Sequence, residues 1–258
     1  ATGACTMSSK GRLAYVTGGM GGIGTAISRR LCREGFRVFA GCGPGSRRKD
    51  PWVAEMRAQG FDVHASEGNV ADWESTRAAF EKVRNELGPV DVLVNNAGIT
   101  RDTMFHKMTK QQWDEVIGTN LNGLFNVTRP CWEGMRARKF GRVINISSVR
   151  ASLGINAGYS AYVAAKGAVS SLTRQWATEW AKHGITVNAI APTFVDTPQV
   201  AMLLDDPVFK ANIVSRIPLG RVGGTSDLAG AALFFASDAS SFVTGQILGI
   251  DGGLTATQ

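Results

Sequence analysis

Short apolar runs alternate with longer helical patterns along almost the whole chain of 258 residues. The apolar runs are rich in β-branched residues and have the length of strands. Strands that alternate with helices form a parallel sheet that is covered on both faces. We therefore expect an α/β protein with a doubly wound parallel sheet of about seven strands, at residues 12–17, 36–41, 61–66, 90–98, 141–148, 185–192 and 245–253.

The helical patterns between these strands support one continuous domain over residues 11–258. The first follows a glycine-rich stretch and ends at Gly35. A long one runs from about Lys110 to Arg138 and contains Pro130, which we expect to kink it. The others lie at 71–88, 159–183 and near 225–237. No proline- or serine-rich linker and no internal repeat of about 20–50 residues divides the series.

The composition excludes several classes of protein. No apolar stretch approaches the roughly 18 residues of a membrane span, and no apolar core near the start suggests a signal peptide. The four cysteines form no CxxC pair, and the three histidines show no metal-ligand spacing. We therefore expect no metal site, no membrane partner and a cytoplasmic location. We also expect residues 1–10 to be disordered, with residues 1–6 an artefact of cloning and Met7 the natural start.

The net charge of +7 leaves two interpretations open: an ordinary basic surface, or a field that steers a phosphorylated ligand. Nucleic acid is not an expected partner, because the chain has no sustained basic run and no basic patch interleaved with aromatic residues.

A glycine-rich turn, TGGMGGIG, lies between the first predicted strand and the first predicted helix. It fits G-x-x-x-G-x-G through Gly18, Gly22 and Gly24, and it also fits G-x-G-x-x-G through Gly19, Gly21 and Gly24. Glycines at such a turn let a pyrophosphate approach the N-terminus of the helix, where free N–H groups favour anions. The position predicts a dinucleotide-binding site.

The end of the second predicted strand indicates which dinucleotide binds. A NAD site usually has an acidic residue there, which holds the ribose 2′-hydroxyl. Between Glu34 and Asp50 this chain has no acid, and it has Ser46, Arg47, Arg48 and Lys49 instead. Cations and a hydroxyl suit a 2′-phosphate, so the loop predicts NADPH/NADP+ as the cofactor.

Tyr162 and Lys166 are four residues apart in a predicted helix and therefore lie on one face of it. An ammonium beside a phenol favours the phenolate and lowers the pKa of the tyrosine. Tyr159 lies one turn earlier, and we expect it to be a pocket-wall or interface residue.

Five motifs in this order resemble the short-chain dehydrogenase/reductase family from about residue 11 to 254: TGxxxGIG, NNAG, TNLNG, ISS and YVAAK. The resemblance implies a Rossmann-type fold and four catalytic residues. Tyr162 is the general acid/base, and Lys166 holds the nicotinamide ribose and lowers the pKa of Tyr162. Ser148 hydrogen-bonds the substrate carbonyl oxygen, and Asn120 holds a water that relays protons to Lys166. Hydride attack builds negative charge on oxygen, which needs such donors.

The resemblance also implies the residues that contact the cofactor. They occupy the glycine turn, the loop after the second strand, the adenine-contacting position, the wall beneath the cofactor and the nicotinamide end. These residues are Gly18, Gly22, Ile23, Gly24, Gly43, Ser46, Arg47, Arg48, Asn69, Val70, Asn95, Ala97, Gly98, Tyr162, Lys166, Pro192, Val195 and Thr197.

Two departures from the family pattern stand out. Ser148 precedes Tyr162 by fourteen positions, one more than the commonest spacing, so either the loop between them bulges or the serine is oriented differently. The usual Pro-Gly after the sixth strand is Pro192-Thr193, which should stiffen that loop.

The substrate is less well determined. Residues 12–149 resemble the acetoacetyl-CoA reductases of polyhydroxybutyrate synthesis, whereas residues 150–258, including the expected substrate lid at 193–217, resemble sugar-acid and polyol dehydrogenases. A hypothesis is that the chain recombines two subfamilies. The first interpretation is NADPH-dependent reduction of a 3-oxoacyl thioester such as acetoacetyl-CoA to 3-hydroxybutyryl-CoA, and the second is chemistry on a sugar acid, polyol or other small ketone. A third is a non-catalytic, dinucleotide-binding regulatory protein. The resemblance implies a homotetramer.

Overall fold

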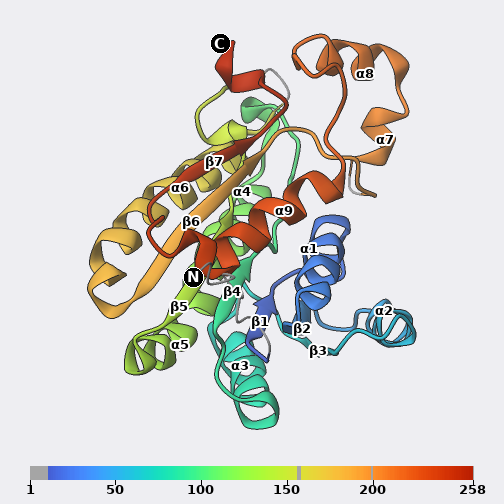
Figure 1. Ribbon diagram of the computed structural model, residues 1–258. Coiled ribbons are helices and arrows are strands. Elements are labelled where there is room, and N and C mark those ends of the chain that lie inside the picture. Colours follow the sequence, from blue (N-terminus) through green and yellow to red (C-terminus); the bar gives the residue numbers. More distant parts are fainter. Residues whose placement is uncertain (1–10, 156–157, 199, 258) are drawn as a thin grey trace, which may run out of the picture.

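A computed structural model describes residues 11–155, 158–198 and 200–257. Residues 1–10, for which disorder and a cloning artefact were expected, lie outside the described residues. Seven parallel strands form one sheet with the order β3-β2-β1-β4-β5-β6-β7 (Figure 1). The strands are β1 (Leu13–Val16), β2 (Arg37–Cys42), β3 (Val63–Glu67), β4 (Val92–Asn95), β5 (Gly141–Ile146), β6 (Ile185–Pro192) and β7 (Ile247–Ile250). The sequence prediction of a seven-stranded parallel sheet is confirmed.

Helices cover both faces of the sheet (Figure 1). On one face, α1, α2 and α9 pack on side chains such as Val16 of β1 and Val94 of β4. On the other, α3, α5 and α6 pack on the alternate side chains, such as Tyr15 and Leu93. The helices are α1 (Gly22–Arg33), α2 (Lys49–Ala58), α3 (Trp73–Leu87), α4 (Lys110–Ile117), α5 (Gly123–Arg138), α6 (Ser160–Trp180), α7 (Ala201–Leu204), α8 (Pro207–Val214) and α9 (Thr225–Ala236).

Short helical turns lie between these helices and strands in the described residues. Five are 3₁₀ turns: η1 (Phe105–Lys107), η3 (Val149–Ala151), η4 (Ala181–His183), η5 (Asp238–Ser240) and η6 (Leu254–Ala256). No helix within the described ranges is long and apolar enough to cross a membrane. Helices α7 and α8 lie together beyond the sheet, in the segment where the sequence predicted a substrate lid (Figure 1).

Pro130, where a kink is expected, does not end the helix. Helix α5 continues through Pro130 from Gly123 to Arg138. The irregular part of the long helical stretch is instead a π-helical turn, η2 (Gly118–Asn122), between α4 and α5. A π turn holds more residues than an α turn and is frequent at functional sites. Here it carries the buried side chain of Asn120.

Candidate active site

A cleft of about 630 Å³ opens where the parallel strands end. Its walls come from the glycine turn after β1, the end of β2, and the segments that follow β4, β5 and β6. In an open α/β sheet, ligands bind outside the carboxyl ends of the strands. Fifteen of the predicted site residues line this cleft: Gly18, Gly22, Ile23, Gly24, Gly43, Ser46, Arg48, Ala97, Gly98, Ser148, Tyr162, Lys166, Pro192, Val195 and Thr197.

The glycine turn brings backbone close to backbone. Gly18 has a φ of 60°, which a residue with a side chain rarely adopts, and a Cβ on Gly24 would lie 2.3 Å from the Gly18 carbonyl oxygen. No side chain caps the first turn of α1, whose N–H groups are therefore available to an anion. Gly18, Gly22 and Gly24 line the cleft, whereas Gly19 packs against Ala40 of β2, so the geometry favours the first of the two glycine patterns.

The segment after β4 is hydrogen-bonded to the glycine turn. The Thr17 hydroxyl accepts hydrogen bonds from the N–H groups of Asn96 and Ala97, each at 3.0 Å. The Asn96 amide donates to the carbonyl oxygens of Thr17 at 2.9 Å and Gly18 at 3.1 Å. Asn96 thus positions the glycine turn and lines the cleft, although the sequence analysis did not single it out. The signal was present in the second asparagine of NNAG.

Asn95, predicted to lie beneath the cofactor, points away from the cleft. It is buried, and its amide donates to Thr128 and to Asn145, each at 2.9 Å. Successive side chains of a strand face opposite sides, which separates Asn95 from Asn96. Asn95 therefore links β4 to α5 and β5 in the interior of the protein, outside the cleft lining.

The loop after β2 contributes Cys42, Gly43, Ser46 and Arg48 to the cleft. Lys49 instead pairs with Glu67 of β3, with 2.5 Å between Nζ and Oε1. The same carboxylate accepts the Gly45 N–H at 2.8 Å. Glu67 therefore holds this loop in place through its contacts with Lys49 and Gly45, and it does not line the cleft.

Three other predicted cofactor residues are not brought to the cleft lining. Arg47 is exposed, Asn69 accepts the Ala71 N–H in the turn before α3, and Val70 packs close to Gly123. A contact of these residues with the cofactor stays a prediction.

Ser148, Tyr162 and Lys166 converge at the inner end of the cleft. Ser148 follows β5, and its hydroxyl accepts the Arg150 N–H at 3.1 Å as the turn η3 begins. This turn lies in the loop that carries the extra residue. Tyr162 and Lys166 are one turn apart on α6, with the Lys166 ammonium 5.6 Å from the centre of the Tyr162 ring. The ammonium donates to the Ile146 carbonyl oxygen at 2.6 Å.

Electrostatics differ from the sequence prediction at Tyr162. Burial raises the pKa of Tyr162, while a hydrogen bond with Ser148 and the nearby charge of Arg150 lower it. The net direction is opposite to the predicted lowering, and the part that Lys166 was expected to play in it stays a prediction. Burial also lowers the pKa of Lys166 to about 8. Burial disfavours the charged form, so the Lys166 ammonium loses its proton at a lower pH than an exposed lysine.

Asn120 lies directly behind this group. Its side-chain oxygen accepts the Ile99 N–H and its amide donates to the Ile99 carbonyl oxygen, both at 2.8 Å. A Cβ on Gly98 would lie 3.3 Å from the Asn120 side-chain oxygen and 3.8 Å from the Lys166 ammonium, so all three groups are neighbours. These two hydrogen bonds set the position of the loop that borders Lys166.

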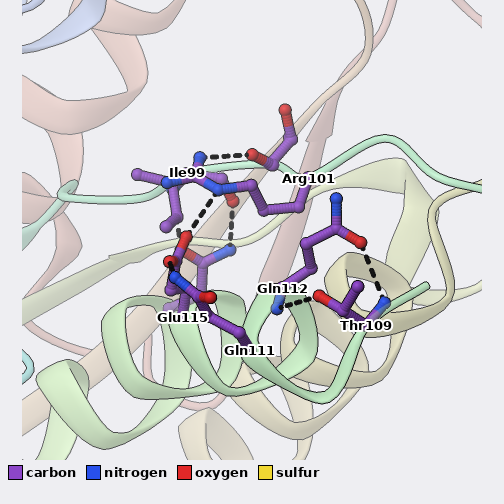
Figure 2. A network of polar contacts seen from close by, with 8 residues as sticks. Ile99, Arg101, Thr109, Gln111, Gln112 and Glu115 are labelled. Carbon is purple, nitrogen blue, oxygen red and sulfur yellow. Dashed lines mark hydrogen bonds and ion pairs between the residues drawn. The ribbon is translucent and has the colours of Figure 1, made fainter.

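Figure 2 shows how the segment from Ile99 to Arg101 is held over helix α4. Arg101 donates to Glu115 at 2.6 Å, and Gln111 donates to the same carboxylate at 2.9 Å. Helix α4 itself begins with a capping box, in which Thr109 and Gln112 exchange hydrogen bonds. These contacts fix one wall of the cleft independently of any ligand.

A family model described as enoyl-(acyl carrier protein) reductase matches residues 18–255. The chain is also 50% identical to an acetoacetyl-CoA reductase from Cupriavidus necator over 243 residues, which cover 94% of this chain and 98% of that one. The chain is a short-chain dehydrogenase/reductase. It is 40% identical to a 3-oxoacyl-(acyl-carrier-protein) reductase from Staphylococcus aureus over 93% of this chain and 97% of that one.

Among solved structures, this reductase is similar to a gluconate 5-dehydrogenase from Burkholderia cenocepacia in complex with NADP and tartrate. The two share 36% identity over 96% of each chain, with a TM-score of 0.91. Both likenesses of the sequence analysis are thus found, and both alignments run across residue 150. The recombination of two subfamilies stays a hypothesis.

The substrate end of the reductase contains residues that no motif indicated. Arg150, Phe194 and Thr100 line it together with Tyr159, which takes the pocket-wall position expected of it. Burial and the charge of Asp102 raise the pKa of Tyr159 to about 12, and the two side chains are hydrogen-bonded. Tyr159 therefore stays protonated beside Tyr162.

Proposed function

We propose that this protein is an NADPH-dependent carbonyl reductase that reduces the 3-keto group of an acyl thioester, with acetoacetyl-CoA as the first candidate. The observation that carries this proposal is the 50% identity with the Cupriavidus necator acetoacetyl-CoA reductase over nearly the full length of both chains. The cleft supports it, because one continuous hollow joins the glycine turn to Ser148, Tyr162 and Lys166.

The residues of the cleft fit a dinucleotide with a 2′-phosphate. The turn around Gly24 has no room for a side chain and leaves the N-terminus of α1 open to the pyrophosphate. At the end of β2, Ser46 and Arg48 line the cleft, and no carboxylate does so in the described part of the chain. A guanidinium and a hydroxyl suit a phosphate dianion. When bound, NADPH supplies the hydride.

The side chains at the inner end of the cleft supply the proton. Ser148 and Tyr162 donate hydrogen bonds to the substrate carbonyl oxygen, where negative charge develops during the reduction. Tyr162 then gives its proton to that oxygen. Lys166, held by the Ile146 carbonyl oxygen, is the group next to Tyr162 that binds the nicotinamide ribose and receives protons through Asn120.

A second candidate is the interconversion of a sugar acid, or another small hydroxy acid, with its ketone. The structural likeness to a gluconate 5-dehydrogenase that holds tartrate favours it. So does a buried arginine in the substrate end of the cleft, Arg150. We propose a homotetramer for either function, as the family resemblance implies.

Initial rates of nicotinamide oxidation with acetoacetyl-CoA, measured with NADPH and NADH side by side, test the proposal. Fast turnover with NADPH alone supports both the cofactor and the thioester. Binding of NADPH without turnover of the thioester rejects the first candidate and leaves the second. Preference for NADH contradicts the assignment of Ser46 and Arg48.

A further inference from the structure

Arg150 is a buried cation at the substrate end of the cleft. It lies two residues after Ser148, on turn η3, and only 6% of its surface is exposed. It also lines the cleft that contains Tyr162. Arginine stays protonated at physiological pH, and burying a charge without a partner is costly.

The surroundings of Arg150 position the guanidinium and leave its charge uncompensated. One of its N–H groups donates to the Gly154 carbonyl oxygen at 3.2 Å, and its guanidinium lies 5.9 Å from the centre of the Phe194 ring. Phe194 is in turn held by an edge-to-face contact with Phe209 of α8. No carboxylate forms an ion pair with Arg150 anywhere in the residues described.

The remaining N–H groups of Arg150 are not sealed in the protein interior. None of its nitrogens is among the buried, unbonded side-chain atoms of the described chain, so the guanidinium has an open side. A second cation, Arg216 beyond α8, is close enough that its charge lowers the pKa of Arg150. Asp102, an acidic side chain at this end, is hydrogen-bonded to Tyr159.

We propose that Arg150 is a specificity-determining residue that binds a carboxylate of the substrate and so favours keto acids, the substrates of the second candidate function, over neutral ketones. A planar guanidinium binds a carboxylate through two parallel hydrogen bonds, and a buried pair of this kind is stronger than an exposed one. Because Arg150 and Ser148 share one turn, the carboxylate lies near the carbonyl that Ser148 contacts. The inference rests on the proposed carbonyl-reductase function and names the substrate class for its second candidate.

Two ketones that differ in charge and by one methyl group test this. Acetoacetate and methyl acetoacetate are reduced at the same carbonyl with NADPH by the wild-type protein, Arg150→Met and Arg150→Lys. We expect the ratio of kcat/KM for acetoacetate to kcat/KM for the ester to fall by at least about tenfold in Arg150→Met. Arg150→Lys, which keeps the charge but lacks the planar fork, should retain part of the ratio.

Turnover of the neutral ester shows that Arg150→Met is folded and that Ser148 and Tyr162 still work. The matched control is Arg174→Met on an exposed position of α6, which should leave the ratio unchanged. If Arg150→Met slows both substrates equally, Arg150 only supports the loop and the inference is overturned.

Binding of malonate, a dicarboxylate without a ketone, separates this inference from the proposed function. Calorimetric titration in saturating NADP+ should show malonate binding to the wild type and at least about tenfold weaker binding to Arg150→Met. If the wild type reduces neither ketone but binds malonate through Arg150, the reductase assignment fails and the carboxylate site stands. If malonate binds both proteins equally, or neither, the carboxylate site is rejected.

Discussion

The ammonium of Lys166 donates to the carbonyl oxygen of Ile146, the last residue of β5, at 2.6 Å. This hydrogen bond holds the buried Lys166 side chain, which belongs to α6, at the carboxyl end of β5. Ser148 follows that same strand. Burial disfavours the charged form and lowers the pKa of Lys166 to about 8. Lys166, which is proposed to bind the nicotinamide ribose, therefore titrates close to physiological pH.

The lowered pKa of Lys166 predicts a pH-dependent stability. Between about pH 8 and the ordinary lysine pKa of 10.5, the unfolded chain holds a proton that the folded chain releases, so the free energy of unfolding rises with pH. Below pH 8 both states hold the proton, and the full cost of burying the charge remains. Relative to Lys166→Met, the wild type should gain about 2 kcal/mol between roughly pH 7 and pH 9.5. Urea unfolding of both proteins at the two pH values measures this, and a constant or falling difference contradicts it.

Loss of the Tyr162 hydroxyl should stop turnover and spare the binding of NADPH. Tyr162→Phe removes the proton donor, and we expect kcat to fall by about 10²- to 10⁴-fold. Tyr159→Phe is the matched control, because Tyr159 bonds to Asp102 and not to Ser148. Its kcat should stay within about tenfold of the wild type. Steady-state rates and the fluorescence of bound NADPH distinguish these outcomes, and equal losses in the two variants would refute the assignment.

Two adjacent arginines should differ in their effect on cofactor choice. Arg47 and Arg48 are both exposed, but only Arg48 lines the cleft. Arg48→Glu places a carboxylate against the 2′-phosphate and should raise the KM for NADPH by at least about tenfold with little change for NADH. Arg47→Glu should change both values little. The measurement is KM for each cofactor with one ketone, and a larger effect at Arg47 would place the phosphate elsewhere.

Two adjacent asparagines should likewise separate binding from stability. Asn96→Ala removes the donor that holds Thr17 and Gly18, so we expect a raised KM for NADPH. Asn95→Ala leaves buried partners unsatisfied and should lower the free energy of unfolding by about 1–3 kcal/mol with a nearly normal KM. Urea unfolding and cofactor titration of both variants provide the comparison. A raised KM in Asn95→Ala would restore the original prediction that Asn95 lies beneath the cofactor.

The parallel sheet was predictable because buried strands between helices leave a strong pattern, and all seven strands lie within or close to their predicted ranges. Helix α2 was not predicted. It starts in a glycine- and arginine-rich stretch, carries Pro51 in its first turn, and buries only Trp52 and Met56. Such a short apolar face is too weak a signal without the sheet on which it packs.

The site residues also divide into those that the sequence predicted and those that only the structure revealed. Ser148, Tyr162 and Lys166 belong to motifs, and the structure brings them together in the cleft. Arg150 belongs to no motif, and its burial depends on Phe194 and Gly154, which only the folded chain brings to it. The raised pKa of Tyr162 was missed because helical spacing gives the neighbour of a phenol and not the depth at which both are buried.

The turn η3 and the start of α6 place Ser148, Arg150, Tyr162 and Lys166 within nineteen consecutive residues. Three of the four proposed catalytic residues and the proposed specificity residue thus share one short segment, while Asn120 lies outside it. An exchange of this segment between relatives would transfer these residues together. The glycine turn before α1 and the end of β2, where the cofactor is proposed to bind, would stay unchanged.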